Sequence, residues 1–273
     1  MKKKIVIMVV VLFALFGVAF GAYTIKADGK KDIASHYFPQ KSQEYIRNMM
    51  IYNGETYEYN GFIFTLENSV YVSKCDMGYY VMSIKQEDGG VEQLKDIIDE
   101  KKAIIVGSYD FDYELEGNVL YCYGRKACDI PEVGQVVVDS CLVPRNPEIY
   151  NWKAFKFNLK DSGGAKVYGN ETFEADVCPL GIRVVKEGKI RTNEVILNYS
   201  NGKDVIIYKE EYDENGKEVG FILNHSMDNG CGLMGVSGVE GKDCFVNMFD
   251  EWFDISELES VTVNGEVLEI INE

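Results

Sequence analysis

The fold class of this chain is decided by a stretch that reads Thr56-Tyr57-Glu58-Tyr59-Asn60-Gly61-Phe62-Ile63-Phe64-Thr65-Leu66. Apolar and polar side chains alternate on both sides of Asn60-Gly61, as they do in strands that bury one face. Asn-Gly readily adopts the positive φ angles of a two-residue hairpin turn. The stretch therefore predicts two antiparallel strands joined by a tight turn.

The same pattern recurs towards the end of the chain. Turn sequences at Asn201-Gly202, Asn215-Gly216 and Asn264-Gly265 each separate short runs rich in Val, Ile and Tyr. Short strands at intervals of roughly 8–12 residues favour an antiparallel β-sandwich over βαβ units. Further strands are expected at Val70–Ser73, Gly78–Lys85, Ala103–Gly107, Ser108–Glu116, Asn118–Tyr123, Gln135–Val138, Phe155–Leu159, Thr172–Val177 and Gly181–Val185.

Helical periodicity is rare. Val91–Lys102 carries apolar residues at helical spacing and predicts one short amphipathic helix, while Ser42–Met50 favours another within a charged spacer. Asn146-Pro147-Glu148 marks a break in the strand pattern. The predicted protein is mainly β, with four parts: a signal peptide or membrane anchor (1–24), a spacer (25–50), a β-rich domain (51–148) and an immunoglobulin-like β-sandwich domain (149–273).

The N-terminus predicts the location. Lys2, Lys3 and Lys4 precede an uncharged apolar run over Ile5–Tyr23, which at about 1.5 Å per helical residue just spans a hydrocarbon core of about 30 Å. The lysines favour an N-terminus inside the cell and a body outside it. Ala19-Phe20-Gly21 also resembles a signal-peptidase site, so the alternative to a single-pass anchor is a protein secreted after cleavage following Gly21.

Charge restricts the partners. Without the three N-terminal lysines the chain has 44 acidic and 25 basic side chains, a net charge of −19. Such a body repels nucleic acid, so no nucleic-acid partner is expected. Acidic surfaces mostly serve solubility, although a basic partner, a cation or a wall polymer would suit this charge as well.

Cysteine usage leaves two alternatives open. The chain contains seven cysteines, an odd number, and no Cys-x-x-Cys motif, while its two histidines are too few for a Cys/His zinc cluster. In an oxidising compartment the glycine-rich segment between Cys231 and Cys244 predicts a disulfide that closes this loop. In a reducing one, all would be buried thiols. The cysteines are Cys75, Cys122, Cys128, Cys141, Cys178, Cys231 and Cys244.

Two stretches carry a family resemblance. One runs over Phe173–Val184, around Val177-Cys178-Pro179-Leu180-Gly181-Ile182-Arg183-Val184, and the other reads Phe253-Asp254-Ile255-Ser256-Glu257-Leu258-Glu259-Ser260-Val261-Thr262-Val263-Asn264-Gly265. Together, over roughly 172–270, they resemble the extracytoplasmic immunoglobulin-like domains of membrane-anchored, anti-sigma-factor-like and uncharacterised proteins of Gram-positive bacteria. The resemblance implies fold and location. It implies no sigma-factor control, since Met1–Lys4 is too short to form a cytoplasmic binding domain.

Two acidic runs carry the carboxylates that a calcium site would need. Asp110, Asp112, Glu114 and Glu116 alternate with apolar residues, which indicates the exposed face of a strand, and Leu115 replaces the glycine that an EF-hand loop requires. Asp213–Glu218 surrounds a glycine between two predicted strands, which is typical of a hairpin turn. Both runs therefore predict structure without a metal.

His225 and Cys231 form the closest Cys/His pair in the sequence, with Asp228 and Asn229 nearby to orient the histidine. A catalytic cysteine needs an activating base and commonly an orienting third group. Catalytic partners, however, meet in space rather than in sequence, and no family signature surrounds Cys231. The sequence accordingly predicts no catalytic residue, no metal ligand and no cofactor.

The predicted function is a non-enzymatic cell-surface binding or sensing module whose partner is an extracellular protein, a peptide or a cell-wall polymer. Its contacts would come from loops or a sheet edge. The alternatives are an exported hydrolase with an unrecognised site and a structural component of a cell-envelope assembly. Aromatic side chains that could form a platform for sugars or peptides are Tyr57, Tyr59, Tyr71, Tyr79, Tyr80, Trp152, Trp252 and Phe253.

Overall fold

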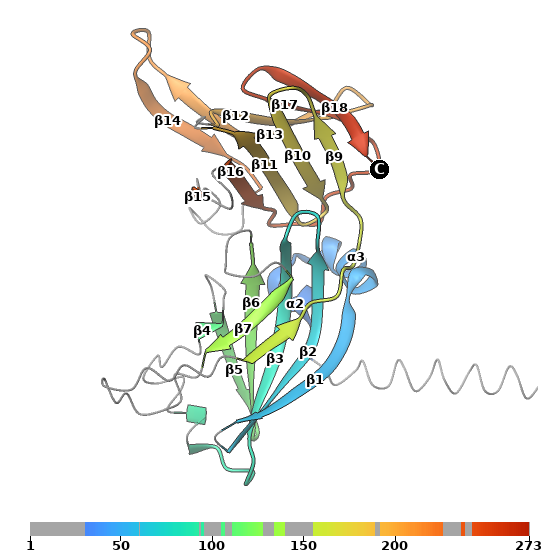
Figure 1. The fold of residues 1–273 in the computed structure, drawn as a ribbon, viewed down its shortest axis with the longest axis vertical. Coiled ribbons are helices and arrows are strands. Elements are labelled where there is room, and N and C mark those ends of the chain that lie inside the picture. The colour runs from blue at the N-terminus through green and yellow to red at the C-terminus, as the bar shows by residue number, and fades with distance from the viewer. Residues whose placement is uncertain are drawn as a thin grey trace, which may run out of the picture. The chain divides into compact units, whose positions relative to one another are not determined.

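The computed structural model describes residues 31–59, 61–92, 94–95, 105–106, 111–127, 134–139, 155–188, 192–225, 236–237 and 242–272. From Ile33 onwards the chain forms one compact unit. Its described strands form three sheets in which all neighbouring strands are antiparallel (Figure 1). The protein is thus mainly β, with antiparallel sheets that include a curled half-barrel.

The N-terminal segment 1–24, predicted as an anchor or signal peptide, lies outside the described residues. No helix in the described part of the chain has both the length and the apolar character needed to cross a membrane.

The first sheet has five strands and contains the hairpin predicted around Asn60-Gly61. Tyr59 pairs with Phe62 and Thr56 with Thr65, so the predicted hairpin is confirmed. Gly61 has a φ of +77°, as this type of turn requires. In sheet order, the strands are β1 (Ile51–Tyr59), β2 (Phe62–Val72), β3 (Met77–Gln86), β6 (Val119–Lys126) and β5 (Phe111–Glu116).

The prediction of a separate strand at Val70–Ser73 is wrong, because β2 continues from Phe62 to Val72. A register shift between Leu66 and Asn68 interrupts its pairing with β3. Beyond this irregularity both faces of the strand are buried, since Val70 and Val72 enter one core cluster and the intervening Tyr71 enters another. The polar residues Glu67-Asn68-Ser69 interrupt the apolar pattern, so the sequence predicts two strands where the structure has one.

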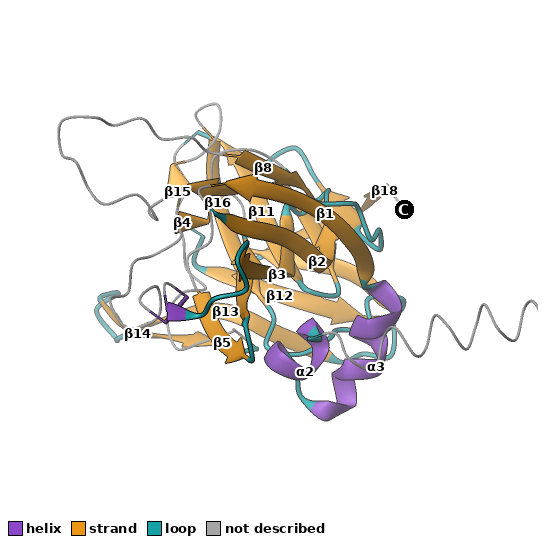
Figure 2. Cartoon of the chain, turned by 90° about the horizontal axis from the view of Figure 1, so that it is seen from below, coloured by secondary structure: helices purple, strands orange, loops and turns teal. Residues whose placement is uncertain are grey.

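Both faces of this sheet are covered. On one face, Val136 and Phe157 of a three-stranded sheet pack against Phe64 and Met82. On the other face, Ile33 and two further buried residues of the helices, shown in purple in Figure 2, pack in the cluster that also holds Val70 and Val72, which we call the third cluster. The covering elements are β4 (Ile105–Val106), β7 (Gln135–Asp139), β8 (Phe155–Asn158), α2 (Ile33–Tyr37) and α3 (Gln40–Met49).

The helix predicted near Ser42–Met50 corresponds to α3. Ile46 of α3 is fully buried, so this part of the predicted spacer packs into the folded body. The helix predicted over Val91–Lys102 lies mostly outside the described residues, although Lys95 donates a helical backbone hydrogen bond to Val91 (3.0 Å).

The second large sheet has ten strands. The hairpins predicted at Asn201-Gly202, Asn215-Gly216 and Asn264-Gly265 connect β12 to β13, β13 to β14 and β17 to β18. In sheet order, the strands are β14 (Glu218–Leu223), β13 (Asp204–Tyr212), β12 (Glu194–Tyr199), β17 (Leu258–Val263), β18 (Glu266–Asn272), β9 (Lys166–Gly169), β10 (Phe173–Cys178), β11 (Gly181–Glu187), β16 (Lys242–Met248) and β15 (Val236–Ser237).

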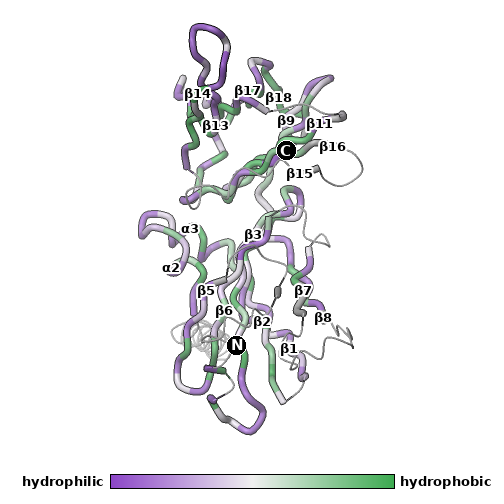
Figure 3. The backbone as a smooth tube through the Cα atoms, turned by 90° about the vertical axis from the view of Figure 1, so that its left-hand side faces the viewer, coloured by the Kyte–Doolittle hydropathy of each residue, from purple (hydrophilic) through white to green (hydrophobic). Residues whose placement is uncertain are grey.

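This sheet curls around its own core. Tyr208 on β13 and Phe245 on β16 are separated by six strands in the sheet order, yet their ring centroids lie 5.5 Å apart. Hydrophobic residues recur along the strands (Figure 3), and the buried side chains of Val177, Leu197 and Val261 share one cluster. The two ends of the sheet therefore approach each other, which gives the half-barrel.

The third cluster also joins the five-stranded sheet to the half-barrel. Met77 and Tyr79 of β3 share it with Cys178, Leu180 and Met248. The division into domains 51–148 and 149–273 stays a prediction. Strand β8, which follows the predicted boundary, pairs with β7, which precedes it.

Candidate functional site

The predicted Cys/His pair is only partly described. His225 follows β14, whereas Cys231, Asp228 and Asn229 lie outside the described residues. Cys244 lies on β16 and is partly buried. The bridge between Cys231 and Cys244 therefore stays a prediction.

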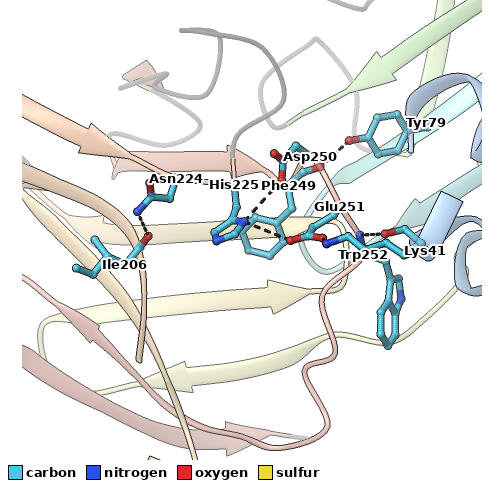
Figure 4. A network of polar contacts seen from close by, with 10 residues as sticks. Lys41, Tyr79, Ile206, Asn224, His225, Phe249, Asp250, Glu251 and Trp252 are labelled. Atoms are coloured by element: carbon cyan, nitrogen blue, oxygen red, sulfur yellow. Dashed lines mark hydrogen bonds and ion pairs between the residues drawn. The ribbon is translucent and has the colours of Figure 1, made fainter. Parts of the chain in front are cut away.

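Two carboxylates from a distant segment meet the His225 side chain (Figure 4). Its Nδ1 lies 3.4 Å from Glu251 Oε1 and 3.8 Å from Asp250 Oδ1. The Asp250 N–H donates a hydrogen bond of 3.1 Å to the His225 carbonyl oxygen, so the backbones of the two segments are joined as well. We call His225, Asp250 and Glu251 the His225 cluster.

The segment that carries these carboxylates is held by its own backbone. The Phe249 N–H donates to Leu180 O (2.8 Å), and the Phe253 N–H donates to Pro179 O (3.1 Å). The Phe253 ring packs edge-on against His225, with 4.9 Å between centroids. Contacts on both sides of the carboxylates thus orient them towards the histidine.

Helix α3 approaches this segment from the other side. Lys41 forms an ion pair with Glu251 Oε2, the carboxylate oxygen that does not face His225. Ser42 Oγ accepts a hydrogen bond from the Trp252 N–H (3.1 Å). The Tyr45 ring stacks on Trp252 with 4.1 Å between centroids and 9° between planes. Helix α3 therefore contacts both Glu251 and Trp252, the consecutive residues that follow Asp250.

A cleft of about 390 Å³ opens where α3 meets the half-barrel, and we call it the α3 cleft. Its lining combines aromatic rings with hydroxyl, amide and charged groups of both signs. Tyr45 is half exposed there, with an exposed fraction of 50%. The lining residues are Lys41, Ser42, Tyr45, Tyr199, Asn201, Lys203, Glu251, Trp252, Phe253, Asp254 and Glu257.

The protonation states in the cleft follow from local contacts. Hydrogen bonds from the Ser256 side chain and backbone hold the pKa of Asp254 below its ordinary value, so this carboxylate is ionised at neutral pH. Burial raises the pKa of Tyr199 to about 12, so this phenol is neutral. The cleft therefore offers both fixed charges and neutral hydrogen-bonding groups to a ligand.

The predicted aromatic platform is dispersed. Tyr71, Tyr79 and Tyr80 are core residues with exposed fractions of at most 1%. Trp252 and Phe253 line the α3 cleft, and Trp152 lies outside the described residues. Tyr45 is absent from the predicted platform, because its stacking partner Trp252 is 207 positions away in the sequence.

Other predicted features have structural roles. Asp112, Glu114 and Glu116 lie on the exposed face of β5, as their alternation predicted. Asp213 Oδ1 accepts backbone hydrogen bonds from Asn215 and Lys217, both 2.9 Å, in the turn before β14. These acidic residues therefore lie in a strand and a turn, as expected.

One sheet edge is apolar and exposed. Strand β14 is terminal in the described sheet, and its Val219 and Phe221 have exposed fractions of 64% and 52%. Edge strands of this kind can pair with an extended segment of another chain.

Comparison with known proteins adds little. No protein-family model and no curated protein matches this sequence. One solved structure, the crystal structure of a conserved domain protein from Bacillus anthracis, matches with a TM-score of 0.30 and 9% identity over 90% of this chain and 93% of that one. Such a likeness carries no argument about function.

Proposed function

We propose that this chain is a non-enzymatic binding module at the cell surface that recognises an extracellular protein, a peptide or a cell-wall polymer. The observation that supports it most is the α3 cleft, in which a half-exposed aromatic ring adjoins side chains that can donate and accept hydrogen bonds. Binding sites are typically concave, with apolar or aromatic walls and a few polar groups that orient the ligand.

The chemistry of the cleft suits a polar polymer or peptide. Lys203 can pair with carboxylates, Asn201 can hydrogen-bond amides, and the Tyr45–Trp252 pair offers an aromatic surface. Peptides and glycans of the cell wall present these complementary groups. The exposed edge of β14 would offer a second contact to an extended segment.

The proposal includes a location and a finer fold. The lysines and apolar run at the N-terminus support a single-pass anchor with the body outside the cell, or secretion after Gly21. The resemblance over roughly 172–270 supports an immunoglobulin-like sandwich for the half-barrel region. Protease added to intact, wall-stripped cells should remove a C-terminal tag, and a protected tag would contradict this orientation.

Binding can be tested with the full chain in detergent. Purified wall material and soluble wall peptides are added, and binding is followed by co-sedimentation and by tryptophan fluorescence. Truncating an exposed aromatic anchor typically costs at least about 1–2 kcal/mol, so Tyr45→Ala should weaken binding about tenfold or more. Tyr212→Ala removes a ring of similar exposure (49%) from β13 and serves as the control. Equal loss in both variants, or in neither, would contradict a site in the α3 cleft.

The alternative of an exported hydrolase draws support from the carboxylates that converge on His225. Within the described part of the chain, the contacts of the His225 ring are to Asp250, Glu251 and Phe253, and none is to a hydroxyl or thiol nucleophile. If the full chain hydrolyses wall peptides and a well-folded His225→Asn variant does not, the enzymatic alternative would replace the binding proposal.

A further inference from the structure

We propose that His225, Asp250 and Glu251 bind one divalent transition-metal ion, with zinc the best match, and that this ion joins the two ends of the curled sheet. The inference is independent of the proposed function. It rests on the donor atoms of the cluster, their spacing and the strands that carry them.

The spacing of the donor atoms fits a shared ion better than direct hydrogen bonds. His225 Nδ1 lies 3.4 Å and 3.8 Å from the two carboxylate oxygens, whereas hydrogen bonds of this kind are about 2.7–3.2 Å long. All three donor atoms lie within 4.8 Å of one another. Ligand atoms about 2.1 Å from a tetrahedral ion lie about 3.4 Å from each other. The cluster therefore needs only small side-chain movements to surround an ion.

The donor types select the class of metal. One imidazole nitrogen and two carboxylate oxygens suit zinc and related transition metals, whereas calcium and magnesium prefer all-oxygen sites. Three protein ligands leave a fourth position for water or another ligand. With side-chain exposed fractions of 36% for His225 and 49% for Asp250, the site is open enough for an ion to enter.

The surroundings restrain the ligands. Lys41 pairs with Glu251 Oε2 and leaves Oε1 directed at His225. The hydrogen bond from Asp250 N–H to His225 O sets the separation of the two segments. Ion pairs and hydrogen bonds of this kind orient metal ligands, so fewer side chains must be ordered when the ion binds.

The topology shows what the ion would connect. His225 follows β14, at one end of the ten-stranded order, while Asp250 and Glu251 follow β16, next to the other end. Ladder hydrogen bonds do not join β14 to β16. An ion bound by residues after both strands would therefore hold the half-barrel in its curled state, and through Lys41 it would adjoin α3.

The test uses the full chain in detergent, stripped of metal by a chelator and titrated with Zn²⁺ by calorimetry. We expect one site, and a melting temperature that rises with zinc concentration. Asp250→Asn should weaken this site more than about tenfold. His225→Asn, chosen because asparagine tolerates the φ of +53° found at position 225, should do the same. Glu259→Gln removes an exposed carboxylate from β17 and should bind zinc like the wild type.

A second readout separates loss of ligands from loss of fold. Cobalt in place of zinc should give the visible absorption of a four-coordinate ion in the wild type, and each ligand variant should lose it while its metal-free melt stays unchanged. If the metal-free form of one ligand variant has a lowered melting temperature, the comparison uses the other ligand variant. Failure of the wild type to bind zinc or cobalt, or equal binding by wild type and both ligand variants, would overturn the proposal.

Discussion

At the scale of single residues, a buried ion pair dominates the β10–β11 hairpin. Asp176 and Arg183 are direct cross-strand partners, and Asp176 is fully buried. Arg183 Nε donates to Asp176 Oδ2 (2.9 Å), while Lys74 Nζ lies 3.8 Å from Oδ1. Burial raises the pKa of Asp176, although the Arg183 charge opposes this shift. The carboxylate is therefore costly to ionise and depends on its cationic partner.

Removing the Arg183 charge should destabilise the fold strongly. We expect Arg183→Met to lower the free energy of unfolding by about 3–5 kcal/mol at neutral pH, because the buried Asp176 carboxylate loses its main counter-charge. Folded Asp176 holds its proton more tightly than the unfolded chain does, so the stability of the variant should be lowest above the folded pKa and should rise as the pH falls through the folded pKa towards the unfolded pKa. Urea titrations at several pH values measure this dependence.

The control is a cross-strand pair of the same kind at the surface. Lys209 Nζ lies 2.8 Å from Glu194 Oε1, and the Lys209 side chain is 46% exposed. Lys209→Met should cost less than about 1 kcal/mol. Adding Asp176→Asn to Arg183→Met should recover part of the loss. Equal losses for Arg183→Met and Lys209→Met would contradict the importance of burial.

At the scale of elements, the pairing of β3 with β6 depends on one missing side chain. Gly124 lies directly opposite Tyr80, whose ring is fully buried and occupies the place that a Cβ at Gly124 would need. The glycine thus lets a tyrosine lie across the neighbouring strand.

We expect Gly124→Ala to lower the free energy of unfolding by about 1–3 kcal/mol, because Tyr80 must leave its position in a close-packed core. Gly220→Ala is the matched control in β14, where the nearest atom to an added Cβ is 3.7 Å away and the backbone is unstrained. It should be neutral or slightly stabilising. Thermal melts of both variants decide the point, and an equally stable Gly124→Ala variant would show that the core can rearrange.

The sequence predicts the individual strands and hairpins, but it does not predict the contacts between distant parts of the chain. Asn60-Gly61 and Asn264-Gly265 identify hairpins because strand alternation and turn chemistry are local properties. Sequence distance pairs His225 with Cys231, yet its described partners, Asp250 and Glu251, lie 25 and 26 positions away. These contacts depend on the curl of the sheet. No local pattern encodes that curl.

At the scale of the whole molecule, one hydrophobic cluster contains residues from the helices, the five-stranded sheet and the half-barrel. The third cluster combines Ile46 of α3, Tyr79 of β3, Tyr123 of β6 and Leu180 beside β10, each almost completely buried. Separating the half-barrel from the five-stranded sheet would expose these side chains to water.

We therefore expect residues 31–273 to unfold in one cooperative transition and to give a β-dominated circular dichroism spectrum. The fragment 51–148 should not fold alone, since it lacks Phe157 of its own core and the half-barrel residues that cover Tyr79. Calorimetry compares the measured and van't Hoff enthalpies. Two separate transitions, or a stable 51–148 fragment, would instead support the division into two domains.

The pairing of β9 with β18 has a consequence for the time course of folding. Val167 pairs with Asn272, more than 100 positions later, and this ladder lies in the middle of the ten-stranded order. The tight hairpins on either side can form as soon as their own residues are free to fold. The two halves of the sheet can join only once β18 is available to β9. Closing so long a loop is slow compared with hairpin formation, so the half-barrel completes itself after its hairpins have formed.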